Sequence, residues 1–207
     1  MRVVPNLYPA LERQEVVVHS PRHVRSFADL EEHELELVAE AWRRRREAVP
    51  VGYLHALVNE GPEAGASLPH SHSQLAWFRE APPAVAEERG ELAVGEVVLE
   101  QDGLVLACPP ASRLPYELVI APVEEEADGL RSELLASALR LLAEGIRRLR
   151  HLEGPVPWNA WLHNGRRWHI EVVPRLAVLA GLELGAGIYV NSLPPEQAAA
   201  ALRAAQP

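Results

Sequence analysis

Apolar and polar positions along the chain follow the same succession twice. Short runs rich in β-branched residues, at residues 15–18 and 117–120, each precede a long amphipathic segment, at residues 27–48 and 132–152. Two apolar runs separated by a polar turn follow each long segment. This order predicts a strand, a helix and two further strands in each half of the chain, with the two starting strands 102 residues apart, at Glu15 and Glu117.

The two long segments also carry the local signals of helices. Ser26 and Asp29 have the spacing of a capping box at the start of the first segment. Gly154 and Pro155 follow the second segment and are typical of a helix end. The expected core-facing side chains of the first helix are Leu30, Leu37, Val38 and Ala41.

The remaining elements complete a prediction of an α+β fold. They are strands at 53–59, 73–78, 91–99, 104–108, 158–163, 168–173 and 188–191 and a helix at 194–204. Long helices packed on mostly antiparallel strands indicate the α+β class. Because no linker rich in Gly or Ser divides the chain, we expect a single domain, 1–207, with pseudo-repeats at about 15–80 and about 117–175.

Composition narrows the chemistry that the chain can perform. A formal net charge of −9 argues against non-specific binding of nucleic acid or of anionic membranes. All 20 basic residues are Arg, so a Schiff-base lysine is excluded and phosphate must be bound by Arg, backbone N–H or small polar groups. A single Cys, Cys108, excludes an internal disulfide. Without a transmembrane-length apolar run or a signal-peptide core, the expected location is cytoplasmic.

The segment from Gly65 to Gln74 carries the strongest signal of chemistry. Small residues approach a His-x-His pair that opens a predicted strand, where positions i and i+2 share a face. His70, His72 and Gln74 are therefore expected side by side. A neutral imidazole is a good nucleophile towards phosphorus, and an amide can hold a phosphoryl oxygen without adding charge. A metal half-site or a polar surface pair are the alternative interpretations of two such histidines.

This segment resembles the active-site motif of the galactose-1-phosphate uridylyltransferases, a branch of the histidine-triad superfamily. Other segments that are similar to the family, in the family's order, are 2–11, 20–23, 111–117, 168–175 and 181–183. The resemblance implies a histidine-triad-like fold of two pseudo-repeats and a homodimer. It also implies enzymes of nucleotide-sugar and galactose metabolism.

The resemblance implies a role for each matching residue. His72 is the nucleophile that becomes uridylylated, and Gln74 binds the transferred phosphoryl group. The expected substrate-binding set combines residues that match the family with residues that could bind substrate because of their chemistry. It is Asn6, Asn59, Gly65, Ser67, His70, Arg113, Arg167, His169 and Glu183. Arg113 is either a phosphate clamp or a salt-bridge partner.

The family's metal sites are only partly present. His23 and His70 fall at its zinc ligands and His163 and His169 at its second metal, with Glu87 or Glu88 at the carboxylate position. The family's Cys-x-x-Cys pair is absent, Arg167 stands where a ligand histidine is usual, and Ser71 replaces a common Pro. We therefore expect no cofactor and no tightly bound zinc.

Together these features predict a nucleotidyltransferase. It would act on a nucleoside-diphosphate sugar through a covalent nucleotidyl-histidine, with nucleotide sugars and sugar phosphates as its partners. The alternatives are a nucleotide-sugar phosphorylase, a nucleotide hydrolase of the histidine-triad type, and a non-catalytic nucleotide-binding protein. The base, the sugar and the acceptor cannot be predicted from the sequence.

Overall fold

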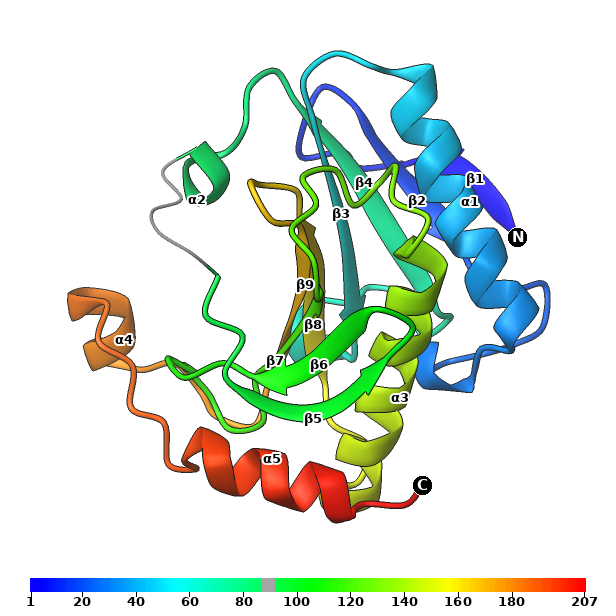
Figure 1. The fold of residues 1–207 in the computed structure, drawn as a ribbon. Helices are drawn as coiled ribbons and strands as arrows, with labels where there is room; N and C mark the ends of the chain where they lie inside the picture. Colours follow the sequence, from blue (N-terminus) through cyan, green and yellow to red (C-terminus); the bar gives the residue numbers. More distant parts are fainter. Residues whose placement is uncertain (87–91) are drawn as a thin grey trace.

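The structure, a computed structural model that describes residues 1–86 and 92–207, is built on one antiparallel sheet (Figure 1). Its strands are β1 (Arg2–Pro5), β2 (Gln14–Val18), β3 (Tyr53–Glu60), β4 (His72–Phe78), β5 (Glu96–Gln101), β6 (Leu104–Cys108), β7 (Leu118–Pro122), β8 (Trp158–His163) and β9 (His169–Pro174). Across the sheet their order is β1-β2-β4-β3-β8-β9-β7-β6-β5. The predicted α+β class and antiparallel sheet are confirmed.

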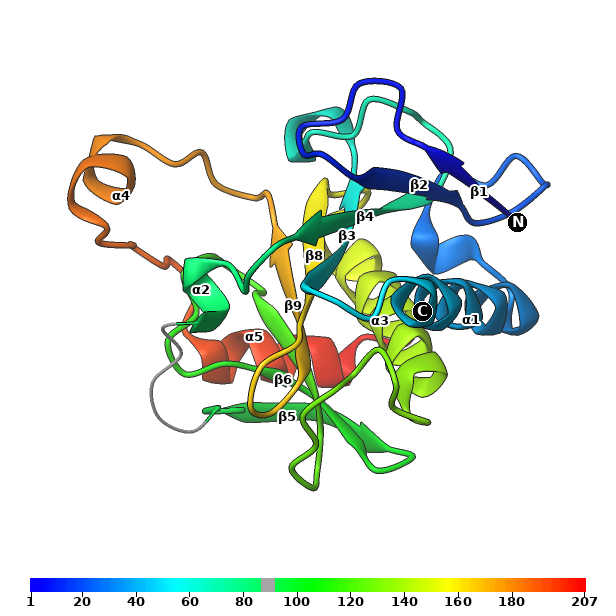
Figure 2. The same cartoon turned by 90° about the horizontal axis from the view of Figure 1, so that it is seen from above.

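Helices α1 (Glu32–Ala48), α3 (Leu135–Glu153) and α5 (Pro195–Ala204) cover one face of this sheet. The short helices α2 (Pro83–Ala86) and α4 (Gly181–Ala186) and the 3-10 turns η1 (Phe27–Asp29) and η2 (Pro62–Ala64) lie in the connections between the larger elements. The long helices α1 and α3 pack against each other, and α5 packs on β5 and β6 (Figure 2). Their apolar sides share one core with alternate strand residues such as Ala56, Val58 and Leu75. The intervening strand residues therefore point to the opposite face.

The two halves of the chain occupy equivalent positions about the centre of the sheet. The first half runs β2–α1–β3–β4 and the second runs β7–α3–β8–β9. β3 pairs with β8 at the centre, so that β4, β2 and β1 continue on one side and β9, β7 and β6 on the other. The sheet is therefore continuous from one half to the other.

Several local predictions are wrong in their boundaries. The first helix begins at Glu32 rather than at 27, because Ser26 caps the short turn η1 and Leu30 leaves the helical conformation at ψ 140°. The capping box of α1 is formed by Glu31 and Glu34. Leu37 is 43% exposed, because it lies on the solvent side of α1 rather than against the core.

The predictions at other element ends are also wrong in part. The second long helix begins at Leu135 rather than at 132. Residues 188–191 form no strand, because they pair with no neighbour in the described part of the chain. β5 begins at Glu96, after Gly95 turns the chain at a φ of 84°. The start of the predicted 91–99 strand lies outside the described residues.

A buried polar contact fixes the start of β4. His19 is fully buried, and its Nδ1 lies 2.9 Å from Ser71 Oγ. The Ser71 N–H donates to the Val24 carbonyl at 2.7 Å, a bond that a Pro at this position could not form. These contacts hold the chain immediately before His72 against the end of β2. Ser71 thus supplies two contacts that a Pro at this position could not supply.

Because His19 is buried, the stability of the protein depends on pH through this residue. Desolvation, together with the neighbouring His72 and His70, lowers the pKa of His19 to about 3. In the unfolded chain His19 titrates near its ordinary value of 6.5, so the unfolded state binds an additional proton below that pH. The stabilisation is complete above pH 6.5 and is lost as pH falls towards 3.

We predict that His19→Asn flattens this dependence. In urea unfolding from pH 7 to pH 5, the free energy of unfolding of the native protein is expected to fall, with a contribution from this group that approaches about 1 kcal/mol per pH unit. This contribution is expected to be absent in the variant. His33→Asn, at an exposed position, is the matched control and is expected to retain the native slope. Equal slopes in native protein and His19→Asn would contradict the prediction.

Candidate active site

The predicted catalytic residues lie on the face of the sheet opposite the helices. Ser73 receives a hydrogen bond from Trp42 Nε1 of α1, which places Ser73 on the helix side. His72 and Gln74, on either side of it in β4, therefore point to the other face. In the register of β3 with β4, Leu57 pairs with Gln74, so Asn59 lies beside the start of β4 at His72. The structure thus brings these three predicted residues together.

One hydrogen bond sets the tautomer of His72. Its Nδ1 lies 2.8 Å from the carbonyl oxygen of His70. A carbonyl oxygen only accepts, so in this bond Nδ1 carries the proton and donates it. In the neutral ring, Nε2 then keeps its lone pair. His72 is 4% exposed, and the orientation of its ring is held by the backbone of its own motif.

A second amide orients Gln74. The Ala10 N–H donates to Gln14 Oε1 at 2.9 Å, which identifies the oxygen end of the Gln14 amide. Gln14 Nε2 then donates to Gln74 Oε1 at 2.6 Å. The Gln74 Nε2 group is consequently the end left to donate to a phosphoryl oxygen. Gln14 was not predicted as a site residue, and the signal that points to it is its place at the start of β2, the strand that pairs with β4.

Two backbone N–H groups of the loop from Gly61 to Ser71 form hydrogen bonds within the loop. Gly65 N–H donates to Pro62 O at 2.9 Å and Ala66 N–H to Gly61 O at 3.1 Å. These two donors are therefore not available to an anion. Gly65 is needed at a φ of 83°, a conformation that favours glycine. Ser67 follows this turn and has no hydrogen bond to any residue in the described ranges.

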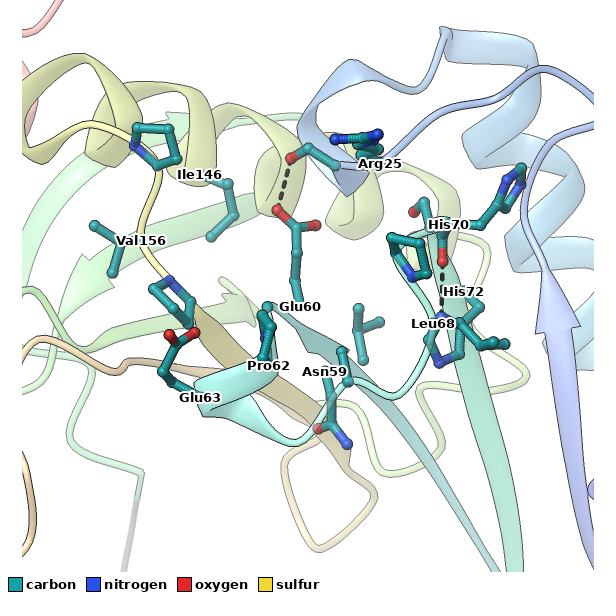
Figure 3. Close-up of a pocket in the computed structure, with 18 of the residues that line it drawn as sticks. Arg25, Asn59, Glu60, Pro62, Glu63, Leu68, His70, His72, Ile146 and Val156 are labelled. Carbon is teal, nitrogen blue, oxygen red and sulfur yellow. Dashed lines mark hydrogen bonds between the residues drawn. The ribbon is translucent and has the colours of Figure 1, made fainter. Parts of the chain in front are cut away.

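A pocket of about 520 Å³ lies under this loop, between it and the ends of η1 and α3 (Figure 3). Four of the predicted site residues line it, namely Asn59, Ser67, His70 and His72. Its wall includes Glu60, whose carboxylate accepts from Ser26 Oγ and from the Phe27 N–H, each at 2.7 Å. Burial raises the pKa of Glu60 despite these bonds. The volume is within the range of pockets that bind small molecules.

Two other predicted residues lie apart from this pocket. Asn6 follows β1, and its N–H donates to Gln14 O, next to the amide that contacts Gln74. Glu183 is at the start of α4, where it accepts from the Ala180 N–H. Figure 1 shows α4 projecting away from the sheet, so within this chain Glu183 does not join the His72 group.

The second half of the chain forms its own polar group on the same face. The rings of His163 and His169 stack with centroids 4.5 Å apart, and Glu171 lies beside them. The ligating atoms of these three side chains all lie within 4.8 Å of one another. Glu171 was not a predicted site residue, and position i+2 from His169 on the strand is the signal that points to it.

Both predicted arginines are engaged by the protein. Arg113 forms ion pairs with Glu117 and, at 2.8 Å, with Glu171. Arg167 donates to the carbonyl oxygens of Pro122 and Val123. Of the two interpretations of Arg113, the observed geometry is that of the salt-bridge partner.

The donor sets fit a metal unequally. His23 and His70 have ring centroids 5.8 Å apart, and they gain no third His, Cys, Asp or Glu ligand among the residues that the structure describes. His163, His169 and Glu171 offer the three protein ligands of an open zinc site. However, Arg113 and Trp161 Nε1 already bind the two carboxylate oxygens of Glu171. The suggested Glu87 and Glu88 lie outside the described residues.

Comparisons with known proteins agree with this fold. The family model for the N-terminal domain of galactose-1-phosphate uridyl transferase matches residues 9–83, which include the His72 motif. An ADP-glucose phosphorylase from Arabidopsis thaliana is 26% identical, over 98% of this chain and 74% of the relative. A galactose-1-phosphate uridylyltransferase from Thermotoga maritima is also 26% identical, over 91% of this chain and 73% of the relative.

The solved structures extend the similarity to three dimensions. A GalT-like protein from Arabidopsis thaliana superposes with a TM-score of 0.90 at 25% identity, over 99% of this chain and 83% of that one. An ADP-glucose phosphorylase from the same plant, solved with bound ADP-glucose, gives a TM-score of 0.90 at 24% identity, over 100% and 82% of the two chains. The resemblance inferred from the sequence is therefore confirmed: in sequence and in fold, the chain is similar to galactose-1-phosphate uridylyltransferase-like proteins.

Proposed function

We propose that this chain transfers a nucleotidyl group from a nucleoside-diphosphate sugar through a covalent bond to His72. The observation that carries the proposal is the hydrogen bond from His72 Nδ1 to the His70 carbonyl, which leaves the lone pair of Nε2 free for attack in a residue that lines the pocket. A nucleophile of this kind needs no metal and no lysine.

The proposed reaction has two balanced steps. His72 Nε2 attacks the α-phosphorus of the donor, a P–N bond forms, and the bond from this phosphorus to the bridging oxygen breaks, so that the sugar 1-phosphate leaves. An oxygen of a phosphate acceptor then attacks the same phosphorus and the P–N bond breaks. Gln14 binds the oxygen of the Gln74 amide, so the Gln74 Nε2 group is free to donate to a non-bridging oxygen in both steps. Positioning of these groups accounts for most of the expected rate.

The acceptor that we favour is inorganic phosphate. The ADP-glucose phosphorylase relative matches nearly the whole chain, and a similar fold binds ADP-glucose. Phosphorolysis of ADP-glucose would then give ADP and glucose 1-phosphate. Galactose 1-phosphate as the acceptor, with a uridylyl group transferred, is the alternative supported by the uridylyltransferase relative.

The nucleophile is tested by trapping the intermediate. Native protein is incubated with ADP-glucose and then denatured at alkaline pH. We expect the peptide that contains His72 to carry the mass of one adenylyl group. UDP-glucose is tested in parallel. His72→Ala is expected to lose the adduct and to lower turnover by about 10⁴-fold or more, because no other group supplies the attacking nitrogen. His72→Gly with added imidazole is expected to regain part of the turnover.

The matched control is His33→Ala, an exposed histidine on α1. It is expected to keep both the adduct and the turnover. Full turnover in His72→Ala would show that another group attacks. Thermal protection of the native protein by the nucleotide sugar, without any adduct or turnover, would instead identify a non-catalytic nucleotide-binding protein.

We also propose that tight zinc binding is not required. Arg113 places a positive charge on the carboxylate of Glu171, and this charge opposes a cation at the His163–His169 pair. Burial would raise the pKa of Glu171, but the neighbouring His169 and Arg113 hold that pKa below its ordinary value, so the carboxylate is charged and paired with Arg113.

Elemental analysis of protein purified without added metal is expected to find well below one zinc per chain. Arg113→Met removes the competing charge and is expected to increase zinc uptake by about tenfold or more. One zinc per chain in the native protein, lost in Glu171→Gln, would contradict this expectation. The homodimer that the resemblance implies and the cytoplasmic location expected from the sequence stay predictions.

A further inference from the structure

We infer that Asn159, in the second half of the chain, is a positioning residue for the His72 site: it anchors the loop before His72 and orients the amide of Asn59. The inference rests on the proposed function for its catalytic consequence. The first pseudo-repeat supplies the nucleophile, and a residue of the second pseudo-repeat helps to position the groups around it.

The anchor consists of two hydrogen bonds from one nitrogen. Asn159 Nδ2 lies 2.8 Å from the Ala64 carbonyl oxygen and 2.8 Å from Asn59 Oδ1. Ala64 ends the turn η2, inside the loop that leads to Ser67 and His72. The loop is therefore tied to the strand β8 across the pairing of β3 with β8.

These bonds determine the orientation of both amides. The Ala64 carbonyl only accepts, so the group that contacts it must be the NH2 end of Asn159. The second hydrogen of that NH2 group points to Asn59, whose contacting atom must then be the oxygen. The NH2 end of Asn59 is left free to donate. Figure 3 shows this nitrogen on the side of Asn59 that is nearer to His72.

Asn59 and Gln74 thus have equivalent arrangements. Gln14 holds the oxygen of Gln74, and Asn159 holds the oxygen of Asn59. Each leaves a neutral donor directed away from its anchor, near the phosphorus-attacking ring. Two preset donors suit the non-bridging oxygens of a phosphoryl group, since fixed donors need no reorganisation during the reaction.

Asn159→Asp tests the orientation. A carboxylate cannot donate to the Ala64 carbonyl, and it attracts the NH2 end of Asn59, so that the oxygen of Asn59 turns towards the phosphoryl group. We expect the single-turnover rate of His72 adenylylation to fall by about 100-fold. Asn159→Leu, which favours neither orientation, is expected to reduce the rate less. Gln101→Glu, with the same change from amide to acid on the exposed β5–β6 hairpin, is the control and is expected to keep the native rate.

A double-mutant cycle separates positioning from a general loss of structure. In an Asn59→Ala background, Asn159→Asp is expected to change the adenylylation rate by less than about threefold, because the amide through which it acts is gone. An equally large loss in both backgrounds would overturn the orienting role.

Hydrogen exchange provides a readout that does not depend on activity. In Asn159→Leu, the peptide covering residues 61–68 is expected to exchange about tenfold faster than in the native protein, because the loop loses its anchor. Unchanged exchange would overturn the anchoring role. If the native protein forms no adduct with any nucleotide sugar, the proposed function fails, and the exchange result still decides whether Asn159 holds the loop.

Discussion

The pairing of β3 with β8 is the contact on which the rest of the structure depends. It joins two halves that each have the order strand, helix, strand, strand, and it makes their sheets one continuous surface. Without it, each half would present an open sheet edge at its centre. Because α1 and α3 also pack against each other on one side, the opposite face is left to both polar groups. The same pairing sets Asn59 opposite Asn159, where the two halves contact each other through side chains.

The two halves share a backbone arrangement and differ in the chemistry placed on it. Nδ1 of His72 lies 2.8 Å from the carbonyl two residues earlier, and Nδ1 of His169 lies 3.0 Å from the equivalent carbonyl. Two residues later, the first half has the amide of Gln74 and the second has the carboxylate of Glu171. A neutral donor beside the first ring suits an anionic phosphoryl group. A carboxylate beside the second ring repels one, and Arg113 neutralises it instead.

Sequence periodicity predicted what depends on one strand at a time. The alternation of β4 placed His72 and Gln74 on one face, and the succession of elements predicted both long helices and the antiparallel sheet. Gln14 and Asn159 were not predicted as site residues, because their roles come from hydrogen bonds across the sheet. Glu171 was not predicted either, although the alternation of β9 places it on the same face as His169. The start of α1 was also missed, since Ser26 has a capping side chain but caps only a single turn.

The central claim is that the backbone of the motif presets His72 as a nucleophile at Nε2. The most direct test is the ¹⁵N chemical shifts of the imidazole nitrogens in the ligand-free protein at pH 8, assigned to His72 by comparison with His72→Ala. The account predicts a protonated Nδ1 and an unprotonated Nε2 for His72, the tautomer that a donor bond to the His70 carbonyl requires. A protonated Nε2 with an unprotonated Nδ1 would contradict the account, because the proposed attacking nitrogen would then have no free lone pair.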